Sequence, residues 1–416
     1  MTGTDAIATI EIDSIAGGGD GVGRVDGRVV FVPRTAPGDM ARVRFTSRGR
    51  FARGVLLAVE RPSPLRIEPA CEHYVTDRCG GCQLQHMTME GQQAAKVRIV
   101  GDALQRIGRR SVDDIPLRAS PRAWRYRRKL TLTLRPAPSE PSGWMGGLHP
   151  FDAPDQVFPL RDCPITEAGV IDAWRGILAV ADAFPDALSL RAGVQVIEGG
   201  FALVLEGGTA WPRWAAFPAA VPSVREIWWT PETGKRRRLF PEGDAPATGA
   251  SFAQVNAAVG EAMHRYVVDR ALSYAPLTAV DAYAGTGATA IALAERGIRV
   301  TAIEADRTAA AAARRHLPEG ARVHATRVEA ALGRALPADL VLLNPPRAGV
   351  DASVTEILNQ ATPRPRAVIY VSCDPATLAR DVKRLAEYRL ARVVCFDMFP
   401  QTAHVETVCE LVPQDS

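Results

Sequence analysis

The octapeptide VDAYAGTG, residues 280–287, decides the fold of the C-terminal part of this chain. An apolar run precedes it, and residues 288–296 are helix-forming residues that end at a glycine. A second apolar run, residues 298–303, is followed directly by Glu304. The order strand, glycine turn, helix, strand and acid predicts a β-α-β unit of the kind that binds nucleotide-type ligands.

The glycine turn and the acid have separate roles in such a unit. Gly285 and Gly287 allow the backbone to approach a ligand, and Glu304 can hold a ribose diol. The full G-x-G-x-x-G spacing is missing, so S-adenosylmethionine (SAM), which needs no pyrophosphate cradle, is favoured over a nicotinamide cofactor. A plain tight turn is the alternative without a ligand.

Strands and helices alternate through the rest of the C-terminal part. Further strands are expected at residues 322–326, 338–343, 367–372, 391–398 and 405–412, with a helix at 376–386. The alternation predicts an α/β, Rossmann-like domain with a parallel, doubly wound sheet. Ligands bind such sheets at the carboxyl ends of the strands, which is where Tyr283, Glu304, Asn344 and Cys373 lie.

A thiol and a carboxylate accompany two of these strands. Cys373 lies in VSCDP, residues 371–375, and Glu406 lies in FPQTAHVE, residues 399–406. These are the groups needed to methylate a pyrimidine ring carbon, because a thiolate that adds to the neighbouring position makes that carbon enolate-like and a base then removes its proton. The alternative for Cys373 is a small buried hydrophobe. A helix that begins directly after it can lower its pKa, which favours the nucleophile.

The chain at this point resembles the RNA uracil-C5 methyltransferases, which make 5-methyluridine in tRNA and 23S rRNA. The resemblance covers almost the whole chain and is carried by SFAQVN (251–256), NPPRAG (344–349), SCDPATLARD (372–381) and FPQTAHVETV (399–408). It implies a class I SAM-dependent methyltransferase domain in which Cys373 attacks uracil C6 and Glu406 removes the C5 proton. The cofactor contacts expected with it are Gln254, Tyr283, Gly285, Gly287, Glu304 and Asn344.

Two positions depart from the family pattern. Asn344 stands where the family usually has Asp, and Ala288 stands where it usually has Asn. The first change removes a charge beside the cofactor or base, and the second removes a polar contact to the cofactor. A weakly catalytic or non-catalytic RNA-binding or ribosome assembly factor is therefore the alternative from another class. Arg347 follows the two prolines where adenine amino-methyltransferases have an aromatic residue, which argues against an amino-group substrate.

Four cysteines form a second pattern: Cys71, Cys79, Cys82 and, far downstream, Cys163. The N-terminal residues lack the basic and apolar regions of a secretory signal, and no apolar run approaches membrane-spanning length, so a cytoplasmic protein is expected. In a reducing compartment, four such cysteines indicate a metal site rather than two disulfides. Their spacing alone suits either zinc or an iron–sulfur cluster. The family resemblance favours a 4Fe-4S cluster with Cys163 as fourth ligand. A radical SAM enzyme is less favoured, because its three cysteines lie closer together.

The positive charge is concentrated at the N-terminal end. The chain of 416 residues has a net charge of +4, yet residues 1–135 carry 23 Lys/Arg and 14 Asp/Glu whereas the remainder carries 27 and 32. Such an asymmetry indicates a polyanionic partner, with a solvated basic face as the alternative. The run WRYRRK, residues 124–129, interleaves aromatic and cationic side chains as an RNA surface would, although an edge strand with its charges in water has the same pattern.

Short strands separated by glycine turns predict a small OB-like β-barrel over residues 1–60. This segment resembles a TRAM domain, an RNA-binding module. Residues 61–245 are expected to form an antiparallel α+β central domain with the four cysteines, and residues 246–416 the catalytic domain. The helix at 88–108 is expected to pack on the catalytic domain, as in the family.

The barrel and the four cysteines favour 23S rRNA as the substrate, because the tRNA T-arm enzymes of this family usually lack both. The tRNA T-arm is the alternative. A monomer that acts on RNA, away from membranes, is expected. No short motif encodes which uridine is methylated, because RNA is recognised through its shape.

Overall fold

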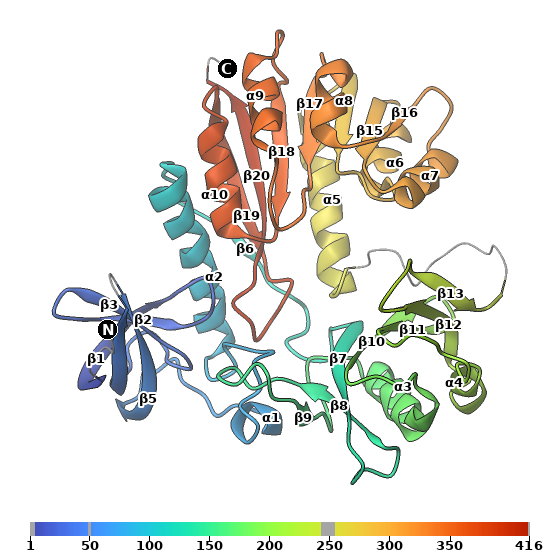
Figure 1. Ribbon diagram of the computed structural model, residues 1–416. Coiled ribbons are helices and arrows are strands. Elements are labelled where there is room, and N and C mark those ends of the chain that lie inside the picture. The colour runs from blue at the N-terminus through green and yellow to red at the C-terminus, as the bar shows by residue number, and fades with distance from the viewer. Residues whose placement is uncertain (1–4, 49–50, 243–253, 415–416) are drawn as a thin grey trace.

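The computed structural model describes residues 5–48, 51–242 and 254–414. A barrel, a central sheet and a larger C-terminal sheet form its three parts, and the long helix α2 (Met89–Ala103) runs from the barrel to the C-terminal sheet (Figure 1). The predicted boundary at residues 245 and 246 lies outside the described residues, as do residues 251–253 of the SFAQVN motif.

The N-terminal barrel has five strands. They are β1 (Asp5–Ile15), β2 (Gly21–Val25), β3 (Arg28–Val32), β4 (Met40–Arg48) and β5 (Phe51–Arg61), which close in the order β1-β2-β3-β5-β4. Ile10, Ile12, Val30 and Val32 fill the interior, because alternate side chains of a strand point to the same face. The predicted OB-like barrel is confirmed.

The central part is a seven-stranded sheet with helices on one face. Its elements are β7 (Lys129–Pro136), β8 (Trp144–Leu148), β9 (Phe158–Pro159), β10 (Leu190–Ile197), β11 (Gly200–Glu206), β12 (Val224–Thr230), β13 (Arg237–Phe240), α3 (Ala168–Ala179), η2 (Ala181–Ala183) and α4 (Ala216–Ala220). The strand order is β13-β12-β11-β10-β7-β8-β9, and all pairs are antiparallel except β11 with β12. Trp174 of α3 and Phe217 of α4 pack with Trp229 beneath the sheet. The predicted α+β central domain is confirmed.

The C-terminal part is an eight-stranded sheet in the order β16-β15-β14-β17-β18-β20-β19-β6. Its strands are β14 (Thr278–Ala282), β15 (Arg299–Glu304), β16 (Arg322–Ala325), β17 (Leu340–Leu343), β18 (Ala367–Ser372), β19 (Tyr388–Phe396), β20 (Glu406–Pro413) and β6 (Leu117–Arg118). Its helices are α5 (Ala257–Ser273), α6 (Ala288–Ala294), α7 (Arg307–His316), α8 (Val328–Ala335), α9 (Ala352–Gln360) and α10 (Pro375–Arg384). Separate apolar cores lie on the two faces of the sheet, so the predicted Rossmann-like, doubly wound fold is confirmed.

One edge of this sheet is not parallel. β20 pairs in antiparallel fashion with both β18 and β19. The connection between β19 and β20, residues 397–405, is too short for a parallel crossover, which needs about a dozen residues or more. The chain therefore turns back as a hairpin, and this hairpin brings Glu406 to the edge of the sheet where the cofactor loop lies.

Segments that precede the central sheet pack on the C-terminal sheet. β6 pairs in parallel with β19, with Leu117 opposite Cys395. Helix α2 continues into the π-helical turn η1 (Leu104–Gly108), and both pack against α10. Val100 and Leu104 belong to the apolar core of that face.

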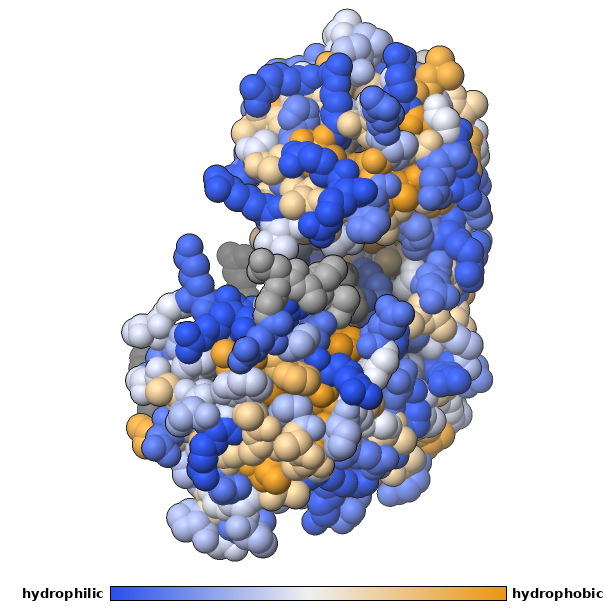
Figure 2. Space-filling model, turned by 90° about the vertical axis from the view of Figure 1, so that its right-hand side faces the viewer, coloured by the Kyte–Doolittle hydropathy of each residue, from blue (hydrophilic) through white to orange (hydrophobic). Residues whose placement is uncertain are grey.

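The two large sheets form separate lobes. Figure 2 shows an indentation between the upper lobe, which holds the C-terminal sheet, and the lower lobe, which holds the central sheet. Most of the surface in this view is hydrophilic. Among the residues described, no helix combines the length and apolar character required to cross a membrane.

Candidate active site

The strand register aligns three of the predicted cofactor residues at one edge of the sheet. Ala282, the last residue of β14, pairs with Ile303 of β15 and with Leu343 of β17. Tyr283, Glu304 and Asn344 each lie at or directly after these positions. Parallel strands end at the same edge, so the three residues lie together at one edge of the sheet.

The glycine turn has the backbone that a close ligand approach requires. Tyr283, Gly285 and Gly287 all have positive φ angles of 62°, 57° and 87°. A Cβ on Gly287 would come within 2.9 Å of the Cβ of Ala313, whereas a Cβ on Gly285 would meet nothing within 4 Å. Gly287 is therefore needed for packing, and Gly285 borders open space.

Glu304 is held against this turn. Its carboxylate accepts hydrogen bonds from the backbone N–H of Gly285 at 2.8 Å and of Asp306 at 2.7 Å. The acid is thus fixed beside the open space at Gly285, which is where a ribose diol would be bound. These residues fit the SAM cofactor.

Two further predicted cofactor residues are Asn344, which follows β17, and Gln254, which precedes α5. Gln254 is half-buried just before α5, and its Cγ would lie 2.7 Å from a Cβ added to Gly260. Asn344 has an exposed side chain, and its backbone N–H donates to the carbonyl oxygen of Ala282 at 3.3 Å. Asn344 is therefore adjacent to the cofactor turn, while Gln254 is anchored on α5.

Cys373 and Glu406 are brought together by the antiparallel ladder. Ser372 of β18 pairs with Thr407 of β20, so Cys373 lies beside Glu406. Glu406 in turn pairs with Phe396 of β19. Cys373 is half-buried directly before α10, and Glu406 is buried. A thiol and a carboxylate thus lie side by side, although they are far apart in the sequence.

The charges at this pair are strongly perturbed. Burial raises the pKa of Glu406 to about 7, and the positive charge of Arg347 acts in the opposite direction. Burial, followed by the carboxylate of Glu406, raises the pKa of the Cys373 thiol, which Arg347 lowers. Burial and the carboxylate of Glu406 outweigh the groups that lower the pKa of Cys373, so its net shift is upward.

The four predicted metal-ligating cysteines line a single cavity of about 120 Å³. Three come from the loops around α1 (Glu72–Val75), and Cys163 comes from the segment after β9. Within residues 5–48, 51–242 and 254–414, no three His, Cys, Asp or Glu side chains converge closely enough to hold one metal ion. A tetrahedral zinc site needs sulfurs about 2.3 Å from a common centre, and the thiols of the described residues are not drawn together to that degree.

Two histidines near this cavity have other partners. Nδ1 of His73 lies 2.6 Å from Asp77, and its Nε2 accepts the backbone N–H of Arg161 at 3.0 Å. Nδ1 of His86 lies 2.7 Å from the hydroxyl of Tyr74. The cysteines are therefore the better candidates for ligands.

Comparison with known proteins identifies the family of this chain. The family described as tRNA (Uracil-5-)-methyltransferase matches residues 320–412, which include both Cys373 and Glu406, and the TRAM domain matches residues 6–57. A 23S rRNA (uracil(1939)-C(5))-methyltransferase RlmD from Thiobacillus denitrificans is 32% identical, over 96% of this chain and 98% of that protein. The chain belongs to the RNA uracil-C5 methyltransferase family.

Two further relatives agree with this membership. An uncharacterized RNA methyltransferase of Thermosynechococcus vestitus is 32% identical over 97% of this chain and 98% of its own length. The solved Pyrococcus abyssi tRNA (uracil-54, C5)-methyltransferase, in complex with S-adenosyl-L-homocysteine, has a TM-score of 0.69 at 24% identity and covers 97% of this chain and 100% of its own. The likeness to this solved structure establishes the shared fold. The chain is thus a SAM-dependent RNA methyltransferase.

Arg347 is a further charged residue whose charge reaches Cys373 and Glu406 in this uracil-C5 methyltransferase, and the sequence did not predict a catalytic role for it. Its charge acts on Cys373, on Glu406 and on His404, although it lies on a different loop from all three. The signal that could have identified it was its place directly after Asn344-Pro345-Pro346, at the end of β17. Its guanidinium can offset negative charge that develops at the thiol or at a bound uracil.

Proposed function

We propose that this enzyme forms 5-methyluridine in 23S rRNA, with Cys373 as the nucleophile and Glu406 as the base. The observation that carries the proposal is the ladder pairing of Ser372 with Thr407, which sets the thiol beside the carboxylate at the edge of the cofactor turn. Neither group alone suffices, because uracil C5 must first be made nucleophilic and must later lose its proton.

The residues act in two stages. The Cys373 thiolate forms a bond to C6 of the uracil, and the electron pair of the C5–C6 double bond moves toward O4, so that C5 becomes nucleophilic. SAM, which Gln254, Tyr283, Glu304 and Asn344 would hold, would supply the methyl group: as C5 bonds to the methyl carbon, the sulfur–methyl bond would break and S-adenosylhomocysteine would leave. Glu406 then takes the C5 proton, the C5–C6 double bond re-forms, and the bond from C6 to the Cys373 sulfur breaks.

The perturbed pKa of Glu406 suits this role. A carboxylate with a pKa of about 7 can accept a proton during turnover and release it to solvent afterwards. Arg347 favours the thiolate form of Cys373 and the carboxylate form of Glu406, but burial outweighs it at both groups, so the base and nucleophile are not both fully charged in the resting site.

Surface chemistry on two parts of the molecule supports RNA as the substrate. Arg42, Arg44 and Arg53 are exposed on the barrel, and Arg53 lies two residues along β5 from Phe51, which is 44% exposed. On the central sheet, the exposed guanidinium of Arg236 lies 5.6 Å from the ring centroid of Trp228, which is itself buried, so Arg236 offers its charge there and Trp228 offers no stacking face. Cations next to aromatic rings bind a phosphate backbone and stack on bases. The target base must also leave its stack to reach Cys373.

The choice of 23S rRNA over tRNA rests on the four cysteines and on relatives named for that substrate. The barrel does not separate the two substrates, because the solved tRNA (uracil-54, C5)-methyltransferase covers 97% of this chain. The test is transfer of labelled methyl from SAM by anaerobically purified protein to separate rRNA and tRNA pools from cells that lack this gene. We expect 5-methyluridine in 23S rRNA, with the site then mapped on fragments. Label in tRNA alone would overturn the substrate but keep the chemistry, and RNA binding without label in either pool would favour the non-catalytic assembly factor.

We also propose that Cys71, Cys79, Cys82 and Cys163 hold a 4Fe-4S cluster. The support is that the four thiols line one cavity and that all-thiolate ligation suits such a cluster. Anaerobically purified protein is expected to contain about four irons and four sulfides per chain, with visible absorbance. Cys163→Ala should lose most of this iron, whereas Cys409→Ala, in the buried β20 strand, should keep it. Stoichiometric zinc in place of iron would contradict the proposal.

A further inference from the structure

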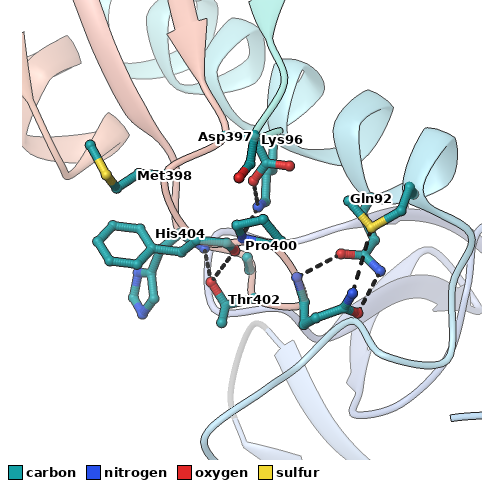
Figure 3. A network of polar contacts seen from close by, with 12 residues as sticks. Gln92, Lys96, Asp397, Met398, Pro400, Thr402 and His404 are labelled. Carbon is teal, nitrogen blue, oxygen red and sulfur yellow. Dashed lines mark hydrogen bonds and ion pairs between the residues drawn. The ribbon is translucent and has the colours of Figure 1, made fainter. Parts of the chain in front are cut away.

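The loop that leads into Glu406 is held from outside its own sheet. Residues 397–405 connect β19 to β20, and the loop ends directly at Glu406. Figure 3 shows Gln92 and Lys96 of α2 directed at this loop from one side, with His404 on the other. Helix α2 lies three hundred residues earlier in the chain, so this contact exists only through the tertiary fold.

Lys96 holds the start of the loop. Its Nζ lies 2.5 Å from Oδ1 of Asp397 and donates to the carbonyl oxygen of Phe399 at 2.9 Å. The side chains of Lys96 and Asp397 are both completely buried. Replacing such a buried ion pair by apolar residues is often neutral or stabilising, so the pair is poorly explained by stability alone. What it does provide is two directional bonds to fixed points of the loop.

Gln92 holds the middle of the loop. Its Oε1 accepts the backbone N–H of Gln401 at 2.9 Å, and its Nε2 donates to Oε1 of Gln401 at 3.0 Å and to the carbonyl oxygen of Met87 at 2.9 Å. Gln401 has a φ angle of 73°, a left-handed conformation that side chains other than glycine rarely adopt. Such a conformation persists where the surroundings hold it, and it is often found at functional sites.

Other groups hold the same short segment. The hydroxyl of Tyr126 donates to the carbonyl oxygen of Pro400 at 2.9 Å, and the backbone N–H of Leu84 donates to the carbonyl oxygen of Gln401 at 3.0 Å. Within the loop, the hydroxyl of Thr402 donates to the carbonyl oxygen of Phe399 at 2.9 Å and accepts from the backbone N–H of His404 at 3.2 Å. The loop is thus bonded along its length, from Asp397 to His404.

We propose that Gln92 and Lys96 are positioning residues for the proton-removal step. They fix the path of residues 397–405, so that Glu406 meets the C5 proton after the methyl group has been transferred. Neither side chain is accessible to RNA or cofactor, because both are buried, so each acts only through the loop. The inference rests on the proposed roles of Cys373 and Glu406. It adds that the rate of adduct breakdown is set from a helix outside the catalytic motifs.

The first test is Gln92→Ala, with Gln93→Ala, at the partly exposed next position of α2, as matched control. Gln92→Ala is expected to lower kcat about 10- to 100-fold, as small misplacements of a reacting group do, with KM for RNA unchanged. Because the defect lies after methyl transfer, the methylated RNA should accumulate as a covalent Cys373 adduct on denaturing gels. Gln93→Ala should turn over as the wild type does and show no adduct.

A second variant separates position from stability. Lys96→Met combined with Asp397→Leu removes both buried charges together, so that no unpaired charge remains. This double variant should fold, with a melting temperature close to that of the wild type, and still accumulate the adduct. If Lys96 and Asp397 only stabilised the fold, the double variant with its wild-type melting temperature would also have wild-type turnover.

The outcomes distinguish this inference from the proposed function. Adduct in Glu406→Gln, with normal turnover in both Gln92→Ala and the double variant, would overturn the positioning role alone. A fall in the rate of adduct formation that only parallels the melting temperature would overturn it as well. No adduct in Glu406→Gln would remove the proposed base, and the positioning role with it.

Discussion

Cys373→Ala is expected to abolish methyl transfer, with a fall in kcat on the order of 10⁶-fold, as removal of a nucleophile causes in other enzymes with covalent catalysis. Without the thiol, no bond forms at C6, and C5 of the uracil keeps the low reactivity of an unactivated ring carbon. Cofactor and RNA binding should persist, because Tyr283, Glu304 and Asn344 lie on other strands. The measurement is single-turnover transfer of labelled methyl, with RNA affinity measured in parallel.

Cys409→Ala is the matched control for this variant. Cys409 is a fully buried cysteine of the neighbouring strand β20 and lies in the apolar core rather than at the sheet edge. It should keep wild-type turnover with at most a loss of stability. Equal activity of Cys373→Ala and Cys409→Ala would remove the covalent mechanism while leaving the enzyme class intact.

Glu406→Gln is expected to lower kcat by about 10²- to 10⁴-fold, the usual contribution of a general base. The amide cannot take the C5 proton, so the adduct between Cys373 and the methylated RNA should accumulate. Burial raises the pKa of Glu406 to about 7, so breakdown of the adduct in the wild type should speed up as pH rises through about 7. The variant should lack this dependence. Rapid-quench kinetics on adduct formation and breakdown between pH 5.5 and 8.5 would measure both, and an unchanged pH profile in the variant would exclude Glu406 as the base.

The same substitution should stabilise the protein at high pH. The pKa of Glu406 rises from an ordinary value of 4.5 to about 7 on folding. A group with a raised folded pKa contributes stability that is fully present below its unfolded pKa and lost as pH rises through its folded pKa. Ionisation of Glu406 above pH 7 therefore costs about 3 kcal/mol. A neutral glutamine avoids this cost, so Glu406→Gln should gain up to that amount at pH 8 and little at pH 4.

Glu410 on the same strand provides a control of opposite sign. Its carboxylate accepts two hydrogen bonds of 2.8 Å from Arg270 and one of 2.8 Å from the hydroxyl of Tyr274. Although burial acts in the opposite direction, these partners lower the pKa of Glu410, so its charged form stabilises the fold above pH 4.5. Glu410→Gln should therefore lose stability at pH 8 in urea unfolding, where Glu406→Gln gains it. The comparison would show that a catalytic carboxylate is kept at the expense of stability.

Local sequence was enough to predict much of this protein. The glycine turn at residues 280–287, the acid Glu304 and the thiol after the 367–372 strand could be read directly, because the apolar periodicity and the turn glycines of a β-α-β unit lie close together in the chain. The barrel could be predicted for the same reason, from short strands between glycine turns. Each of these features depends on neighbours in sequence.

The tertiary structure alone decided how these parts meet. Pairing of Ser372 with Thr407 sets Cys373 beside Glu406, and this required the antiparallel return of β20, which no periodicity encodes. The raised pKa of Cys373, the influence of Arg347 and the contacts of Lys96 and Gln92 with residues 397–401 depend on burial and on charges from distant segments. Sequence determined which chemical groups stand at the ends of strands. Folding decided their neighbours and their protonation, because desolvation and Coulomb interactions depend on distances in space and not on separation along the chain.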